Sequence, residues 1–133
     1  MIYCFCVNNE SVTTDDSEIQ RWPARAPGRS RAARWHGMLG AVASAPEGCE
    51  GLAGQIAYCL QSLDGSLADG GSDKTRLLSV QVVLADKAHK PFLDEAWNAW
   101  IGPDSRNWPQ RSCIGAALAT GLLVEFIVLA AVK

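Results

Sequence analysis

Residues 108–132 read WPQRSCIGAALATGLLVEFIVLAAV, and this stretch decides how the rest of the chain folds. It is the most apolar part of the sequence, yet it carries one arginine, Arg111, and one carboxylate, Glu125. Two structures fit such a pattern, a membrane-spanning helix and a pair of β-strands. The choice between them sets the fold class.

As a helix, residues 113–132 have the length of about 20 residues that a bilayer span needs. However, Glu125 would then lie past the middle of the span, where an ionised carboxylate costs about 2.5–3.5 kcal/mol on insertion scales. The centre of the span would also hold Thr120 and Gly121, and only Lys133 follows it. The sequence therefore argues against a membrane span.

As strands, residues 111–118 and 122–132 form a β-hairpin with a turn at residues 119–121, where Gly121 supplies the positive φ that short loops need. The second strand is apolar on both faces, as expected of a central strand covered on both sides. We therefore expect the hairpin. Polar groups in such strands are costly to bury without a use, which makes Arg111 and Glu125 the first candidates for a functional site.

The expected hairpin also limits where a site can form. Glu125 would lie opposite Gly115, with Arg111 roughly 13 Å further along at about 3.3 Å per residue. One small ligand would hardly touch both side chains of one chain. We therefore expect a site that is shared between subunits.

The composition is that of one ordinary globular domain. The 133 residues are 48% hydrophobic and 20% charged, enough for a substantial core. The net charge of −2 gives no overall attraction to nucleic acid, although five of the 12 basic residues cluster near the N-terminus. This arginine cluster fits a phosphate-binding arm or a solvated segment entering the first strand, and we favour the latter. It consists of Arg21, Arg25, Arg29, Arg31 and Arg34.

Cysteine and histidine placement bears on metals and on the compartment. The five cysteines include no C-x-x-C pair, so we expect neither a disulfide framework nor a zinc site, and a cytoplasmic protein. His36 and His89 lie far apart and near no carboxylate at ligand spacing, so we expect no metal. Residues 1–7 lack the basic lead of a signal peptide. Residues 1–18 are expected to be a loose appendage, and residues 19–133 the domain.

The hydrophobic pattern predicts an alternation of strands and helices. The first helix shows one apolar stripe at steps of three and four and stops at Gly70 and Gly71, whereas the second has Pro91 in its first turn. In chain order we expect an irregular or edge segment at residues 19–34, a strand at 34–43 with a turn at His36 and Gly37, a helix at 50–69, a strand at 75–85, a helix at 90–101 and the tail hairpin.

These elements predict an α+β domain of two layers. Helices that connect neighbouring strands of a mixed sheet pack on one face of it. The central strands are apolar on both faces, and two helices cover only one. Another subunit must cover the second face, so we expect a homo-oligomer.

Short motifs follow one another in a fixed order between about residue 19 and residue 132. They are Gly54-Gln55, Leu63-Asp64, Leu67-Ala68-Asp69-Gly70-Gly71-Ser72-Asp73-Lys74, Leu84-Ala85-Asp86, Trp97-Asn98-Ala99-Trp100, Pro109-Gln110-Arg111-Ser112-Cys113 and Leu123-Val124-Glu125. As an ordered set they resemble the Rid family of reactive intermediate deaminases, also known as the YjgF or L-PSP endoribonuclease family.

The resemblance implies a chorismate-mutase-like fold and a homotrimer with clefts between its subunits. It also implies hydrolysis of small enamines and imines, such as 2-aminoacrylate, to a 2-keto acid and ammonia without a cofactor. In the family an arginine in P-x-R-[SA] grips the substrate carboxylate, and Arg111 matches it. A glutamate in the last strand helps to place the attacking water, and Glu125 matches it.

Other positions depart from the pattern of the active deaminases. Val42 and Ala43 stand where Ser-Gly-Gln is common, so the serine is displaced or lost. Arg29 or Ser30 stands where a tyrosine often precedes the first core strand. Asp94 replaces an asparagine, and it is either a polar wall of the cleft or an exposed carboxylate favoured by the helix dipole.

The chemistry of the residues fits these roles. The planar fork of Arg111 meets a carboxylate bidentately, and Glu125 is suited to act as a base or to position water. Either can instead be a structural ion-pair partner. Cys113 shares a strand face with Arg111 and is placed to line the cleft, but without a histidine to activate it we expect no nucleophilic role. Trp97 and Trp100 are expected in the core or an interface.

Three functions are compatible with the sequence. The first is a deaminase of small enamine or imine carboxylates, or a pathway-specific relative. The second is a non-catalytic trimeric sensor of small carboxylate metabolites. The third is RNA binding or cleavage, which would need the arginine cluster to form a surface stripe.

Overall fold

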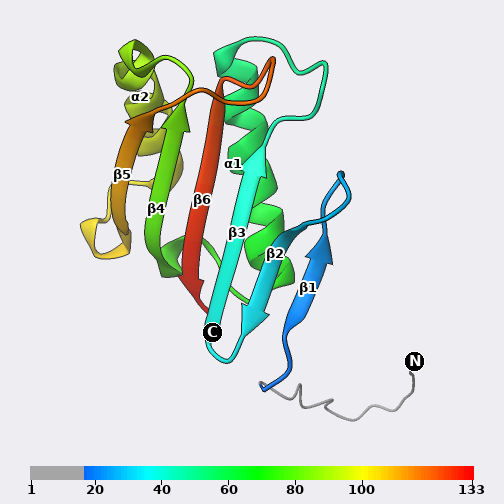
Figure 1. The fold of residues 1–133 in the computed structure, drawn as a ribbon. Helices are drawn as coiled ribbons and strands as arrows, with labels where there is room; N and C mark the ends of the chain where they lie inside the picture. The colour runs from blue at the N-terminus through cyan, green and yellow to red at the C-terminus, as the bar shows by residue number, and fades with distance from the viewer. Residues whose placement is uncertain (1–16) are drawn as a thin grey trace.

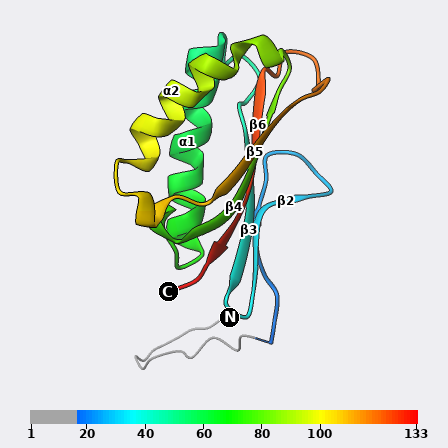
Figure 2. The same ribbon diagram turned by 90° about the vertical axis from the view of Figure 1, so that its left-hand side faces the viewer.

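The structure, a computed structural model, describes residues 17–133. Six strands form one sheet in the order β1-β2-β3-β6-β4-β5 (Figure 1). Both helices lie against the same face of this sheet, and the other face is open (Figure 2). The predicted α+β fold of two layers with a mixed sheet is confirmed. Residues 1–16 of the predicted appendage lie outside the described residues.

The strands and helices agree with the predicted periodicities except at the two ends of the domain. The segment expected to be irregular or an edge holds a β-hairpin, because β1 pairs antiparallel with β2 at the sheet edge. In chain order the elements are β1 (Gln20–Pro23), β2 (Ser30–Trp35), β3 (Met38–Ser44), α1 (Leu52–Asp69), β4 (Leu77–Leu84), α2 (Lys90–Ile101), β5 (Gln110–Gly115) and β6 (Val124–Ala131).

The predicted tail hairpin is wrong. β5 pairs with β4 in parallel, and β6 lies between β3 and β4, antiparallel to both. The apolar character of β6 on both faces suits the centre of the sheet, whereas β5 alternates exposed and half-buried residues and takes the edge. The predicted turn at residues 119–121 exists, with Gly121 at φ 87°. It belongs to a connection that passes from β5 over the end of β4 (Figure 1).

Residues 113–132 do not form a helix, in agreement with the argument against a membrane span, because they contain the end of β5 and all of β6. None of the helices between residues 17 and 133 combines the length and the apolar content that a bilayer crossing requires.

The core lies between the sheet and the two helices. Phe126 of β6 and Leu63 of α1 are both fully buried there, and Trp97 of α2 is 6% exposed. On the open face, by contrast, apolar side chains of three strands remain about two-fifths exposed. These side chains, which we call the open-face patch, are Met38 (42%), Val42 (41%), Ile114 (42%) and Ile127 (39%).

One buried amide anchors the connection between β5 and β6. The Gln55 side chain is in the first turns of α1, and its Nε2 donates to the carbonyls of Cys49 and Gly121 at 3.0 and 2.9 Å. Its Oε1 accepts from the backbone N–H of Leu123 at 2.9 Å. Gln55 is only 2% exposed, so these bonds fix the chain immediately before β6.

Gln55→Leu should destabilise the fold although it adds apolar volume. The substitution leaves two carbonyls and one N–H without their partner, and unmade buried hydrogen bonds cost about 1–3 kcal/mol each. We expect urea denaturation to show a loss of at least about 2 kcal/mol in the free energy of unfolding. Gln61→Leu on the exposed side of α1 is the matched control, and equal losses for the two variants would contradict the anchoring role.

Candidate functional site

Arg111 lies on the edge strand β5 and faces the helix layer. Register places it in one row with Ala41, Val128 and Val80, which are buried beneath the helices. Its side chain is 17% exposed. The guanidinium carbon lies 5.6 Å from the centre of the Trp97 ring, so α2 covers this arginine.

The partner of Arg111 is Asp94 in the first turns of α2. Arg111 Nη2 donates to Asp94 Oδ1 at 2.5 Å, and Lys90 Nζ donates to the other carboxylate oxygen at 2.8 Å. The hydrogen bond from Lys90 and then that from Arg111 lower the pKa of Asp94 from its usual value. Asp94 is therefore an ion-pair partner of Arg111 and Lys90.

The second terminal nitrogen of Arg111 makes no hydrogen bond to the described residues. Nη1 is buried and has no hydrogen-bond partner among residues 17–133. A buried donor without a partner is costly, and such groups in native proteins call for a water, an ion or a ligand to satisfy them. Arg111 thus has one nitrogen committed to Asp94 and one available to a further acceptor.

Cys113 follows Arg111 on the same face, as the sequence predicted. It pairs with Val82 and packs, partly buried, against the core. None of the residues in this row is charged, because Cys113 is followed by Val82, Phe126 and Ala43. The thiol of Cys113 is therefore the only polar side-chain group of the row.

Glu125 lies on the open face of the sheet. It stands between Ser44 of β3 and Val83 of β4, and Ile114 continues the same row. Val42 and Ile127 form the next row on this face. Glu125 therefore lies beside apolar side chains of the open-face patch.

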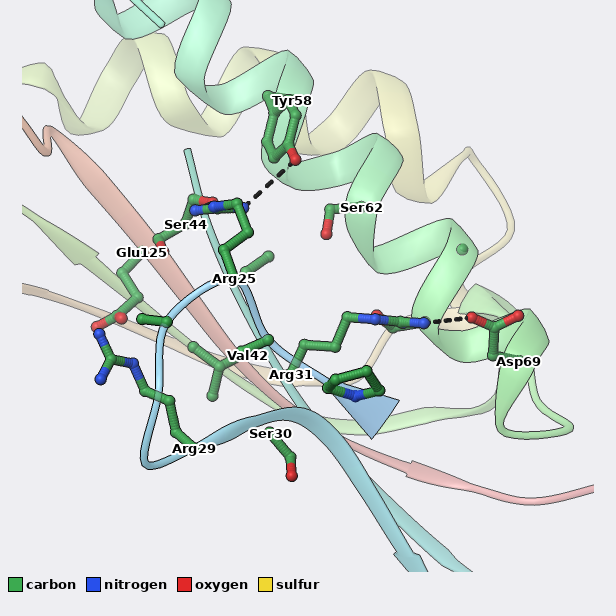
Figure 3. Close-up of a pocket in the computed structure, with 16 residues that line it drawn as sticks. Arg25, Arg29, Ser30, Arg31, Val42, Ser44, Tyr58, Ser62, Asp69 and Glu125 are labelled. Carbon is green, nitrogen blue, oxygen red and sulfur yellow. Dashed lines mark hydrogen bonds and ion pairs between the residues drawn. The ribbon is translucent and has the colours of Figure 1, made fainter. Parts of the chain in front are cut away.

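A cavity of about 700 Å³ borders Glu125 where β2 and β3 separate. The pairing of these strands ends at Ala32 and Ala41, but β3 continues to Ser44. Residues 24–29 turn away from the sheet, and α1 forms the opposite wall (Figure 3). Val42, Ala43 and Arg29, which the sequence analysis placed at the site, line this cavity together with Glu125.

Two arginines that the sequence analysis did not assign to the site bridge the cavity to α1. Arg25 Nη2 donates to the Ser44 carbonyl at 3.1 Å, and its Nη1 donates to Tyr58 Oη at 3.4 Å (Figure 3). Arg31 donates to Ser66 Oγ and to Asp69 Oδ2, both at 2.6 Å.

Arg29 occupies the third side of the cavity. It donates to the carbonyl of Pro27 at 3.2 Å, and its guanidinium points toward the Glu125 carboxylate (Figure 3). The arginine cluster was the available signal for these residues. A second signal was the polar stripe of α1, which repeats at steps of three and four through Tyr58, Ser62, Ser66 and Asp69.

The structure does not bring Arg111 and Glu125 together. Measured along β4, Glu125 is opposite Val83 and Arg111 is opposite Val80. Three residues along the strand and two strand spacings give a separation of roughly 14 Å, and the side chains leave opposite faces. The predicted separation was derived from a hairpin that does not exist. The conclusion is nevertheless the same, because one small ligand cannot contact both Arg111 and Glu125 of a single chain.

Comparison with known proteins assigns the family. The family model described as Endoribonuclease L-PSP matches residues 37–132, which include both Arg111 and Glu125. The chain belongs to the endoribonuclease L-PSP family. The resemblance to the Rid, or YjgF, family that the short motifs indicated is therefore confirmed.

Relatives of this L-PSP family protein agree in sequence and in fold. A RutC family protein of Haemophilus ducreyi is 35% identical over 80 residues, which are 59% of this chain and 67% of the relative. The crystal structure of a YjgF family member from Neisseria meningitidis matches with a TM-score of 0.80 and 28% identity over 90% of this chain and 98% of that one. A Rid family protein of Yersinia pestis, described as of unknown function, shares the fold, with a TM-score of 0.71, 21% identity and coverage of 92% and 98%.

Metal ligands do not gather near these residues. Over the part of the chain that the structure describes, no three His, Cys, Asp or Glu side chains are grouped so that they could hold an ion.

Asp94→Asn should make folding less stable in a pH-dependent way. The pKa of Asp94 is lowered in the folded state, so its contribution is present above the ordinary carboxyl pKa of about 3.9 and is lost as the pH falls through the lowered value. The variant should lose about 1 kcal/mol at neutral pH, the difference between a charged and a neutral hydrogen bond. Urea midpoints of the two proteins should begin to converge only when the pH falls below about 4, and should meet once it has passed the lowered pKa of Asp94.

The control for this experiment is Glu95→Gln, which removes the neighbouring, exposed carboxylate. A gap between wild type and Asp94→Asn that persists unchanged at low pH would show that the charge of Asp94 does not stabilise the fold.

Proposed function

We propose that the protein is a hydrolytic deaminase of small enamine or imine carboxylates and that it acts as a homotrimer. Membership of the L-PSP family supports a Rid-type function. The observation that carries the finer proposal is Arg111 Nη1, a buried cationic donor without a partner among the described residues. It lies at the position of the arginine that grips the substrate carboxylate in related deaminases.

A second copy of the chain completes this site. Arg111 is on the edge strand and Glu125 is on the open face, roughly 14 Å away. The open-face patch surrounds Glu125 with exposed apolar side chains, and such a patch marks a surface that another chain covers. A neighbour that packs its β5 edge against this face supplies the arginine to the glutamate. Two different surfaces meet in such a contact, and a contact of this type gives a ring when the rotation between neighbours closes after three subunits.

The reaction needs a fixed cation, a proton and a water. Protonation of the β-carbon of the enamine by solvent gives the iminium ion, and Arg111 holds the adjacent carboxylate through Nη1. Glu125 accepts a proton from the water that attacks the iminium carbon. Glu125 returns this proton to the amine of the resulting carbinolamine. Ammonia then leaves, the hydroxyl proton is released to water, and the carbonyl of the 2-keto acid forms. Every bond change uses substrate, water and side chains only.

Asp94 weakens the attraction between Arg111 and a substrate carboxylate. Related deaminases carry a neutral asparagine at this position, whereas Asp94 is hydrogen-bonded to Arg111 and lowers the positive charge that the substrate meets. Lys90 offsets part of this effect because it pairs with the same carboxylate at 2.8 Å. We expect the carboxylate of the substrate to add to Nη1 rather than to displace Asp94 from Nη2.

The oligomer is tested by light scattering. Wild type should have about three times the mass of the 14.3 kDa chain. Ile127→Glu places a charge in the centre of the open-face patch, where its burial would be costly, so this variant should dissociate. Ile19→Glu changes a side chain that is 50% exposed outside this patch and should leave the mass unchanged. A wild-type mass of one chain at micromolar concentration would rule out the trimer.

The deaminase activity is tested by releasing 2-aminoacrylate from a pyridoxal-dependent serine- or cysteine-consuming enzyme and following pyruvate. Wild type should accelerate pyruvate formation. Arg111→Lys replaces a fork with a point charge and loses a charged hydrogen bond of about 1.5–3 kcal/mol, so its rate should fall roughly tenfold to a hundredfold. Glu125→Gln should bind carboxylates normally and lose most of the turnover.

Each outcome distinguishes among the proposed functions. Carboxylate binding that depends on Arg111 without any acceleration would favour the metabolite sensor. Absence of carboxylate binding would remove Arg111 from the site. The ribonuclease alternative has less support, because Arg25, Arg29 and Arg31 line the cavity and the charge of Arg31 is paired with Asp69.

A further inference from the structure

We propose that the cavity beside Glu125 binds a second acidic group through Arg25, so that the substrate is the enamine or imine of a dicarboxylic acid. This inference rests on the proposed function, because it takes Glu125 as the reacting end of the site. The side chain of the substrate, rather than the carboxylate next to the reacting carbon, is what Arg25 recognises.

The size of the cavity argues for a substrate larger than 2-aminoacrylate. Pockets of about 300–1,000 Å³ bury ligands of drug size, and this cavity has about 700 Å³. A three-carbon acid that reacts at Glu125 would leave most of that space to water. The cavity extends away from Glu125 toward Tyr58 and Ser62 of α1 (Figure 3), which gives a longer side chain a place.

The charges of the cavity argue for an acidic ligand. Three arginines and two carboxylates line it, and the difference of three and two leaves one positive charge. Arg31 is neutralised by its ion pair with Asp69 at 2.6 Å, and Arg29 points toward Glu125 (Figure 3). Arg25 forms no ion pair among residues 17–133, and its hydrogen bonds go to a carbonyl and a phenol, which are both neutral.

The position of Arg25 brings it within reach of a reacting substrate. It donates to the carbonyl of Ser44, and Ser44 is the register partner of Glu125. The backbones of the two residues are therefore about one strand spacing, ~4.8 Å, apart. A substrate of four or five carbons with its reacting carbon at Glu125 can place its distal group at Arg25.

The walls between these two ends suit methylene groups. Val42, 41% exposed, lies in the row next to Glu125 on the open face, where related deaminases have a serine. The hydroxyl of Tyr58 holds one nitrogen of Arg25 and the Ser44 carbonyl holds the other, so the guanidinium is oriented before a ligand arrives. A preoriented fork binds a carboxylate bidentately.

Titration calorimetry with stable 2-oxo acids tests the proposal. The probes are 2-oxoglutarate, which has a second carboxylate, 2-oxobutyrate, which has none, and inorganic phosphate. Wild type should bind 2-oxoglutarate more tightly than 2-oxobutyrate. Arg25→Gln should weaken 2-oxoglutarate binding by about tenfold or more and leave 2-oxobutyrate binding unchanged. Arg21→Gln, at an exposed arginine of β1, is the matched control and should change neither.

The remaining outcomes are equally decisive. Equal affinity of wild type for both 2-oxo acids overturns the second acidic group. An equal loss of affinity for both 2-oxo acids in Arg25→Gln also overturns the proposal, because Arg25 would then bind the carboxylate next to the reacting carbon. Phosphate binding that depends on Arg25 and exceeds that of 2-oxoglutarate supports the anion site but changes its ligand to a phosphorylated side chain.

The two proposals fail separately. The deaminase proposal is judged by pyruvate formation from 2-aminoacrylate, which does not need the second acidic group. Arg21→Gln, which lies outside the cavity, should retain that activity within about twofold, a difference of roughly 0.4 kcal/mol. Thermal unfolding of Arg25→Gln should show that the exposed side chain was removed without loss of the fold.

Discussion

The structure depends on the insertion of β6 between β3 and β4. Both neighbours are antiparallel to it, and β6 pairs over nearly its whole length with β3 on one side and with β4 on the other. Side chains alternate between the two faces along β6. Because Phe126 and Val128 point into the core, Glu125 points to the opposite face. The same register carries across β4 to β5 and turns Arg111 toward the helices, so one strand pairing divides the two charged candidates between two faces.

Much of this fold could be predicted from periodicity, but the pairing of the last strands could not. The apolar stripe of α1 and the two-sided apolar pattern of β6 are local signals, and both led to correct elements. Strand pairing is not local. A short turn between β5 and β6 predicts a hairpin, yet β4 was already available to separate them, because the α2 crossover delivers β5 parallel to β4 on its outer side.

The candidate site shows the same division. Arg111 and Glu125 could be found because each is a charge within an apolar strand. Arg25 and Tyr58 could not be assigned to a common cavity, because 33 residues separate them and neither is unusual in its own segment. The role of Asp94 as partner of Arg111 likewise depends on the packing of α2 against β5. The residue types therefore indicated the chemistry of the site, whereas the packing of the elements determined which residues lie together in it.

The anchoring of the β5–β6 connection by Gln55 divides that connection into two parts with different freedom to evolve. Residues 116–120 are mostly exposed, whereas Gly121 and Leu123 are held by the buried amide. Because loops tolerate changes of length at little cost in closure entropy, an insertion in the first part changes the upper rim of the molecule without moving Glu125. The start of β6 is thus held in place, and an insertion in residues 116–120 can change the surface above it without displacing Glu125.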